Sequence, residues 1–230
     1  MINSLIDKRE KHIKQYLEFN KLEEYPLNIN HIVQWANGCA SNNLLKQEKF
    51  RILELGTKRS KEAVPTNKKH LFQHIKNLEY VMTDYQEGID VDVVCDLHKT
   101  AQVFQDETFD LIISFSTFEH LKYPQLCSHN LMKLLKIGGR IVIQTHQTFP
   151  LHGYKYDYFR FSREALKAIF SQKMNFKTIT SYFNSQCAIV PHTDYGVWND
   201  VAESYLNVVY IGEKTDKTPN TYIYDIDNEN

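Results

Sequence analysis

The stretch FDLIISFSTFEHL, residues 109–121, decides the fold class of this chain. Its first seven residues are apolar at nearly every position, which is typical of a strand that is covered on both faces of a parallel sheet. The segment then turns polar and carries Glu119 and His120. Because loops carry functional residues more often than regular elements do, this stretch predicts a sheet with functional side chains at its strand ends.

Runs of the same kind lie on both sides of it. Short runs rich in Val and Ile occur at FRILEL (50–55), LEYVMT (78–83), VDVVC (91–95) and RIVIQT (140–145), and two further strand-like runs at 176–183 and 205–212. Helical patterns over 66–76, 124–136 and 162–171 separate several of these runs. We therefore predict an α/β fold, a doubly wound and mostly parallel sheet that binds ligands at the carboxyl ends of its strands.

The chain divides into three parts by pattern. Residues 1–47 carry apolar side chains at helical spacing, over 4–22 and again over 28–47, and predict N-terminal helices packed on the core. Residues 48–213 contain all the predicted strands, and residues 214–230 form a polar tail. A length of 230 residues suffices for one domain of ordinary size with a real core.

The composition excludes several classes of protein. Lys and Arg number 27 and Asp and Glu 28, giving a net charge of -1 without a basic, aromatic-rich patch, so we expect no nucleic-acid partner. No apolar run approaches the ~20 residues of a membrane span, and the first residues do not resemble a signal peptide. The four cysteines form no CxxC pair. We expect a cytoplasmic location.

The residues that follow the strands indicate which cofactor fits. A dinucleotide site needs several glycines where the pyrophosphate approaches the backbone, whereas the first run ends in ILELGTKRS with the single Gly56. A cofactor without phosphates needs less, and Glu54 would sit beneath the same turn. Asp84 can accept both hydroxyls of a ribose, and Asp96 with Leu97 can meet an adenine. A plain strand-to-helix turn and a helix cap are the alternative interpretations of Gly56 and Asp84.

Taken in order, these segments resemble a known family. ILELGT, TD at 83–84, CDLH at 95–98, FDLIISFSTFEHL at 109–121 and LKIGGRIVIQT at 135–145 are together similar to class I S-adenosylmethionine-dependent methyltransferases, most of all the type-11 group. The resemblance covers about residues 50–172. It implies a Rossmann-like, seven-stranded sheet with an antiparallel last strand, an S-adenosylmethionine cofactor and a small-molecule acceptor.

The resemblance also implies which residues contact the cofactor. They lie at the strand ends: Glu54, Leu55, Gly56, Thr57, Asp84, Tyr85, Asp96, Leu97, Ser114, Phe115 and Ser116. Within this set Asp84 would bind the ribose diol, and Asp96 and Leu97 would bracket the adenine. The family commonly has more glycines where this chain has Lys58 and Arg59, so either of these could bind the cofactor carboxylate. A solvated basic turn is the alternative.

An aromatic, histidine-rich stretch, THQTFPLHGYKYDYFRF (145–161), follows the fifth strand. It resembles a segment of type-11-like methyltransferases that often accompany surface-saccharide biosynthesis, with Lys155 in place of a usual proline. This stretch and PHTDYGVW (191–198) supply the predicted acceptor contacts: Tyr154, Tyr156, Arg160, His192 and Tyr195. Arg160 would hold an anionic acceptor. A salt bridge from Arg160 to Asp157 and an aromatic cap over the sheet are the alternatives.

An alcohol acceptor must lose a proton, and histidine is the natural base near neutral pH. The candidates are His146, His120 and His152, and His146 is favoured because it follows the strand whose end faces the cofactor. His120 is alternatively a cap or a positioning group. Neither the His146 and His152 pair nor His192-x-Asp194 has a recognised metal-ligand spacing, so no metal is predicted.

The sequence thus predicts an S-adenosylmethionine-dependent methyltransferase that acts on a small polar acceptor. The methylated atom would be a hydroxyl or phosphoryl oxygen of a sugar, a sugar-linked phosphate or a phosphoramidate, in capsule or other surface-polysaccharide biosynthesis. The main alternative is a catalytically inactive methyltransferase-like scaffold or partner subunit, which the glycine-poor first motif favours. A nucleotide-sugar or NAD enzyme is disfavoured by the missing phosphate-binding glycines.

Overall fold

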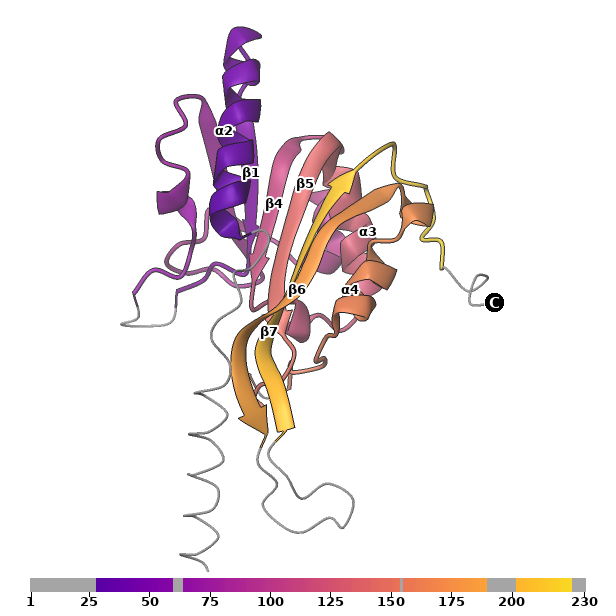
Figure 1. The fold of residues 1–230 in the computed structure, drawn as a ribbon. Coiled ribbons are helices and arrows are strands. Elements are labelled where there is room, and N and C mark those ends of the chain that lie inside the picture. Colours follow the sequence, from indigo (N-terminus) through magenta and orange to yellow (C-terminus); the bar gives the residue numbers. More distant parts are fainter. Residues whose placement is uncertain (1–27, 60–63, 154, 190–201, 225–230) are drawn as a thin grey trace, which may run out of the picture.

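The computed structural model describes residues 28–59, 64–153, 155–189 and 202–224. They form a seven-stranded sheet in the order β3-β2-β1-β4-β5-β7-β6 (Figure 1). The strands are β1 (Phe50–Leu55), β2 (Leu78–Asp84), β3 (Val93–Val94), β4 (Phe109–Phe115), β5 (Leu135–His146), β6 (Phe176–Ile189) and β7 (Ala202–Lys214). Strands β1 to β5 pair in parallel, and β7 is antiparallel to both β5 and β6. The predicted fold class, with its antiparallel last strand, is confirmed.

Helices cover both faces of the sheet (Figure 1). Helix α2 (Ile29–Leu45) begins at Asn28, whose side chain accepts a hydrogen bond from the Asn30 N–H, and buries a stripe that includes Ile32 and Ala36. This stripe packs with apolar side chains of β1, β2 and β4 in one core. The second core, on the opposite face, contains side chains of α3 (Pro124–Leu134) and α4 (Arg163–Ile169). No helix in the described ranges combines the length and apolar character needed to cross a bilayer.

The sheet changes winding direction between β1 and β4. The chain passes from β1 outward to β2 and β3, and then returns to the other side of β1 as β4. Connections leave the carboxyl ends of β1 and β4 on opposite sides, which opens a crevice there. Three short 3₁₀ helices, η2 (Leu97–Gln102), η3 (Phe118–His120) and η4 (Gln172–Met174), lie in the later connections.

The helix predicted over 66–76 is wrong. The structure has only a single 3₁₀ turn there, η1 (Lys69–Leu71). Two interactions replace the helix: the Lys68 N–H donates to the buried Glu54 carboxylate at 3.0 Å, and Phe72 is buried in the core that contains α2. The other later elements are close to their predicted ranges, but β5 begins at Leu135 instead of residue 140 and β6 ends at Ile189 instead of residue 183. The helix predicted over 4–22 lies outside the described residues.

Candidate active site

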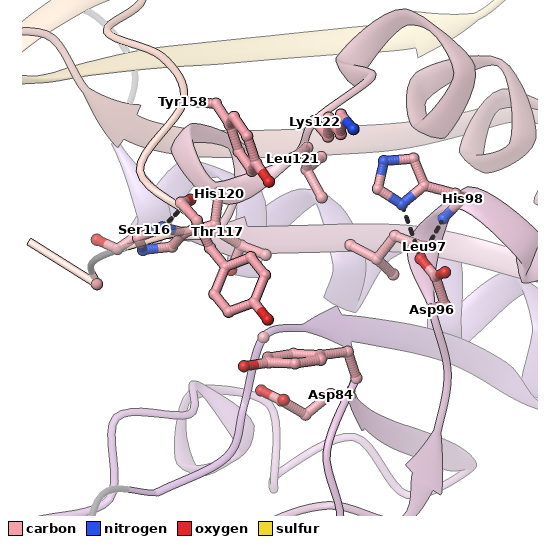
Figure 2. Close-up of a pocket in the computed structure, with 14 residues that line it drawn as sticks. Asp84, Asp96, Leu97, His98, Ser116, Thr117, His120, Leu121, Lys122 and Tyr158 are labelled. Atoms are coloured by element: carbon pink, nitrogen blue, oxygen red, sulfur yellow. Dashed lines mark hydrogen bonds and ion pairs between the residues drawn. The ribbon is translucent and has the colours of Figure 1, made fainter.

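A cavity of about 620 Å³ opens at the carboxyl edge of the sheet, beside the ends of β1 and β4 (Figure 2). This volume is within the range of ~300–1,000 Å³ that is usual for small-molecule sites. Residues at or after the ends of five strands line it: Gly56 after β1; Asp84 and Tyr85 from β2; Asp96, Leu97 and His98 after β3; Ser116, Thr117, His120, Leu121 and Lys122 after β4; Gly153, Tyr156 and Tyr158 after β5. The position is the one that a doubly wound sheet predicts for its ligand.

The turn after β1 requires glycine. Gly56 has a φ of +69°, in the left-handed region where a side chain is strained. A Cβ at this position would also overlap the hydroxyl of Thr117, and it would lie 3.0 Å from the Thr117 Cγ2. Thr117 in turn is held by hydrogen bonds to the carbonyls of Leu55 and Phe115, at 3.3 and 3.2 Å. The loops after β1 and β4 therefore meet with no room for another atom.

Backbone groups hold Asp84 in place. The Lys58 N–H donates to its Oδ2 and the Gln86 N–H to its Oδ1, each at 3.1 Å. A carboxylate oxygen has two lone pairs, so both oxygens of Asp84 keep capacity for a further donor. Figure 2 shows Asp84 and Tyr158 on opposite sides of the pocket.

Asp96 is tied to the neighbouring His98. Its Oδ1 accepts from the His98 N–H at 3.0 Å and lies 2.7 Å from the His98 Nδ1. Burial acts to raise the pKa of Asp96, but the hydrogen bonds from His98 outweigh it and lower the pKa overall. Leu97, which is buried, presents an apolar side chain to the same wall.

A fully buried carboxylate, Glu119, lies among three histidines next to the cavity. Its Oε2 accepts a hydrogen bond of 2.6 Å from Thr145, while its Oε1 has no hydrogen-bond donor. Around Oε1 lie the His146 Nδ1 at 3.1 Å, the His120 Nε2 at 3.8 Å and the His152 Nε2 at 3.9 Å. Burial lowers the pKa of His146, and the charge of Glu119 offsets that effect only in part.

The loop after β5 is fixed by its own ion pair and by Glu119. Arg160 binds Asp157 through two contacts, of 2.5 and 2.8 Å, and also donates to the carbonyls of Phe149 and Pro150. The hydrogen bonds from Arg160 hold the pKa of Asp157 well below its usual range. The N–H groups of Tyr158 and Phe159 donate to the Glu119 carbonyl, at 2.9 and 3.1 Å. This loop is therefore an ordered wall of the cavity.

Comparison with known proteins identifies the family. Residues 88–213, more than half of the chain, match a family described as "Methyltransferase domain". The chain belongs to this methyltransferase family. Its membership confirms the predicted class of enzyme, a transferase of methyl groups that uses S-adenosylmethionine. No curated protein sequence matches the methyltransferase.

Two solved structures show the same fold. The structure of 1,6-didemethyltoxoflavin-N1-methyltransferase from Burkholderia thailandensis, with its bound ligand and S-adenosylhomocysteine, is 15% identical; the match covers 79% of each chain with a TM-score of 0.51. A SAM-dependent methyltransferase from Archaeoglobus fulgidus is 14% identical; the match covers 79% of this chain and 94% of that one, with a TM-score of 0.52. At these identities the likeness concerns the fold alone.

The residues at the cavity fit S-adenosylmethionine. Asp84 keeps acceptor capacity for a ribose diol, and Leu97 offers an apolar surface to a purine. The absence of a side chain at Gly56 leaves backbone exposed at the end of β1, where a cofactor can approach closely.

The structure places half of the predicted ligand residues that it describes at the cavity and the other half away from it. Those that line the cavity are Gly56, Asp84, Tyr85, Asp96, Leu97, Ser116, His120 and Tyr156. Those that do not are Glu54, Leu55, Thr57, Ser114, Phe115, His146, His152 and Arg160. Tyr154, His192 and Tyr195 lie outside the described residues.

Contacts elsewhere in the fold keep the side chains of Glu54 and Arg59 away from the cavity. The Glu54 side chain is buried and accepts hydrogen bonds from Tyr80 at 2.7 Å and from the Lys68 N–H. It therefore stabilises the connection between β1 and β2. Burial raises the pKa of Glu54, and these hydrogen bonds offset the effect in part. Arg59 forms an ion pair with Asp90, at 2.7 Å, instead of reaching the cavity.

Sequence reasoning missed several residues of the cavity wall, and it assigned no role to Glu119, which lies next to the cavity. His98 and Thr117 lie within a few residues of the ends of β3 and β4, and that position was a usable signal for both. Glu119 lies in the decisive stretch, but its partner His152 comes from another loop. Only the folded chain brings these two side chains together.

Proposed function

We propose that this methyltransferase transfers the methyl group of S-adenosylmethionine to a hydroxyl or phosphoryl oxygen of a sugar, a sugar-linked phosphate or a phosphoramidate. One observation carries the proposal: a histidine with a free ring nitrogen lines the cavity. The His120 Nδ1 lies 2.8 Å from the Tyr156 carbonyl oxygen, which can only accept, so Nδ1 carries the proton. Nε2 of His120 is left with a lone pair that can take a proton from an acceptor.

This assignment moves the proposed base from His146 to His120. His146 is 5% exposed, is stacked on Phe149 with ring centroids 4.0 Å apart, and does not line the cavity. His152 donates through Nδ1 toward the Pro150 carbonyl, at 3.1 Å, and lies behind His120 with ring centroids 4.9 Å apart. His120 is the candidate base that lines the cavity.

We assign the cofactor to one wall of the cavity and the acceptor to the opposite wall. When bound, S-adenosylmethionine supplies an electrophilic methyl group on a positively charged sulfur. We assign its ribose to Asp84 and its adenine to Asp96 and Leu97, which would fix the orientation of the methyl group. The opposite wall, with His120 and Tyr158, would hold the acceptor. Because the leaving sulfide is neutral, alignment of the acceptor is the main contribution that these residues make to the rate.

The chemistry of the acceptor wall supports a polar substrate. Tyr156 and Tyr158 provide both an aromatic surface and a hydroxyl, and their loop is fixed by hydrogen bonds to the Glu119 carbonyl. The further proposal of a role in surface-polysaccharide biosynthesis rests on the similarity of residues 145–161 to that group of methyltransferases.

The test is a panel of nucleotide-linked sugars, sugar phosphates and phosphoramidates, incubated with the full chain and S-adenosylmethionine and assayed for the mass gain of one methyl group. We expect one acceptor class to react, and His120→Asn to lower the rate by about 10²–10⁴-fold with the affinity for S-adenosylhomocysteine retained. His70→Asn, at an exposed position away from the cavity, is the matched control. Binding of S-adenosylhomocysteine without methylation of any acceptor in the panel would contradict the proposal.

A further inference from the structure

The cluster around Glu119 contains a buried carboxylate oxygen that no donor among the described residues satisfies. The Glu119 side chain is 0% exposed, and its Oε1 lacks a hydrogen-bond donor. The nearest polar atom, the His146 Nδ1 at 3.1 Å, makes no hydrogen bond to it, and a buried carboxylate oxygen without a hydrogen-bond donor is destabilised. An atom of this kind therefore indicates a ligand at that point.

The two half-exposed histidines present lone pairs to the same point. Carbonyl oxygens of Tyr156 and Pro150 face the Nδ1 atoms of His120 and His152, so in both neutral rings the proton lies on Nδ1. Both Nε2 atoms then face the Glu119 Oε1 with lone pairs, at 3.8 and 3.9 Å. These separations are too long for hydrogen bonds. Three electron-pair donors thus converge with no proton shared between them.

This arrangement is that of a metal site. Metal-binding histidines characteristically donate their second ring N–H to a backbone carbonyl or a carboxylate, which fixes the ring and leaves the other nitrogen for the ion. One ligand atom from each of Glu119, His120 and His152 lies within 4.8 Å of the others. Ligands of a tetrahedral ion with bonds of about 2.1 Å are roughly 3.4 Å apart, so small movements of the rings would close the site.

We propose that Glu119, His120 and His152 bind a divalent transition-metal ion. Two imidazoles with one carboxylate suit Zn²⁺, Fe²⁺, Co²⁺ or Ni²⁺ and disfavour Mg²⁺ and Ca²⁺, which prefer oxygen ligands. Three protein ligands leave open positions, as in catalytic zinc sites. None of the sequence spacings indicated this site, because His152 comes from the loop after β5 and the other two ligands from η3.

Two neighbouring residues support the geometry. Gly153 lies against the His120 ring, and a Cβ there would be 3.0 Å from the ring Cε1, so a larger residue would displace the ligand. His146 closes the buried side of the site, with its Nδ1 3.1 Å from the Glu119 Oε1.

The site adjoins the cavity through His120, so the ion would face the acceptor. This consequence rests on the proposed function. A hydroxyl bound to a divalent ion loses its proton more readily than a free one, so the acceptor would release its proton to solvent while Nε2 of His120 binds the ion. The metal site and its ligands do not depend on that consequence.

The test measures metal binding alone. The full chain, freed of metal with a chelator, is titrated with Zn²⁺ in a calorimeter and with Co²⁺ by visible absorption, without S-adenosylmethionine or acceptor. We expect one ion per chain and a d–d spectrum typical of nitrogen and oxygen ligands. His152→Ala and Glu119→Gln should each weaken binding by at least about tenfold, the loss already seen when outer partners of metal ligands are removed. His70→Ala should bind as the unmodified chain does.

Two results would overturn the inference: no binding of either ion, or binding that His152→Ala and Glu119→Gln leave unchanged. Circular dichroism checks that both variants fold. If the buried Glu119 proves essential for folding, His152→Ala alone provides the test, because the His152 side chain is 31% exposed. Metal binding without methylation of any acceptor refutes the proposed function only. Methylation by a chain that binds no metal refutes the metal site only.

Discussion

Gly56→Ala provides a test of the close contact between the loops after β1 and β4. The substitution has two costs that can be separated. The first is the φ of +69°, where an L-residue is destabilised by about 1–2 kcal/mol. The second is the overlap with the Thr117 side chain, comparable to overpacking of a core, which costs about 1–3 kcal/mol. We expect a total loss of about 2–5 kcal/mol in the free energy of unfolding.

Two further variants separate these costs in urea denaturation. Gly138→Ala is the matched control, because Gly138 has a φ of +79° but a Cβ there meets nothing within 4 Å; it should show the first cost alone. Thr117→Ala should relieve the overlap, so the double variant with Gly56→Ala should recover about 1–3 kcal/mol relative to additivity. Gly56→Ala alone should also weaken binding of S-adenosylhomocysteine. Costs for Gly56→Ala and Thr117→Ala that add within about 0.5 kcal/mol would refute the packing argument.

Three further substitutions test other parts of the structure. Asp84→Ala should lower the affinity for S-adenosylhomocysteine by about 10–100-fold in calorimetry, since a hydrogen bond to a charged group contributes about 1.5–3 kcal/mol; unchanged affinity would place the ribose elsewhere. Burial lowers the pKa of His146, so below pH 6.5 the unfolded state takes up a proton that the folded state does not. The free energy of unfolding should therefore decrease as the pH falls, by up to about 1.4 kcal/mol per pH unit. His146→Phe should flatten this part of the urea-denaturation profile between pH 7.5 and 5.5, and an unchanged profile would contradict the assignment. Tyr80→Phe removes the hydroxyl that donates to buried Glu54 at 2.7 Å and should cost about 1–3 kcal/mol at pH 7.5, whereas a loss under 0.5 kcal/mol would show that Glu54 finds another donor.

The sheet was predictable because its central strands are apolar at most positions. The runs 50–55 and 109–115 match β1 and β4 to the residue, since strands that are buried on both faces read as nearly continuous apolar runs. Strands β6 and β7 extend beyond the predicted runs, because their added residues pair with each other across the hairpin and need no apolar pattern. The failed helix over 66–76 reflects the Glu54 contact with the Lys68 N–H, which local sequence does not reveal.

The position of the wall to which we assign the cofactor was predictable for a different reason. Gly56, Asp84 and Asp96 each lie at or just after the end of a strand, and the topology alone brings such positions to one crevice. The wall to which we assign the acceptor was harder to predict from the sequence, because His120 and His152 become neighbours only through the path of the loop after β5. The family match, over residues 88–213, includes this loop but begins after Gly56 and Asp84.

Glu119 is the residue that connects the parts of the acceptor wall. Its carbonyl accepts the N–H groups of Tyr158 and Phe159, which sets the path of the loop after β5. Its Oε2 binds Thr145 at the end of β5, and its Oε1 faces the histidines. The wall that carries Asp84 and Gly56 shares none of these hydrogen bonds, since it depends on the backbone of Lys58 and Gln86 and on the Thr117 contact. The residues that we assign to the cofactor and those that we assign to the acceptor proton are therefore held by different hydrogen bonds, and changes to the Glu119 side chain should affect the second proposed function with little effect on the first.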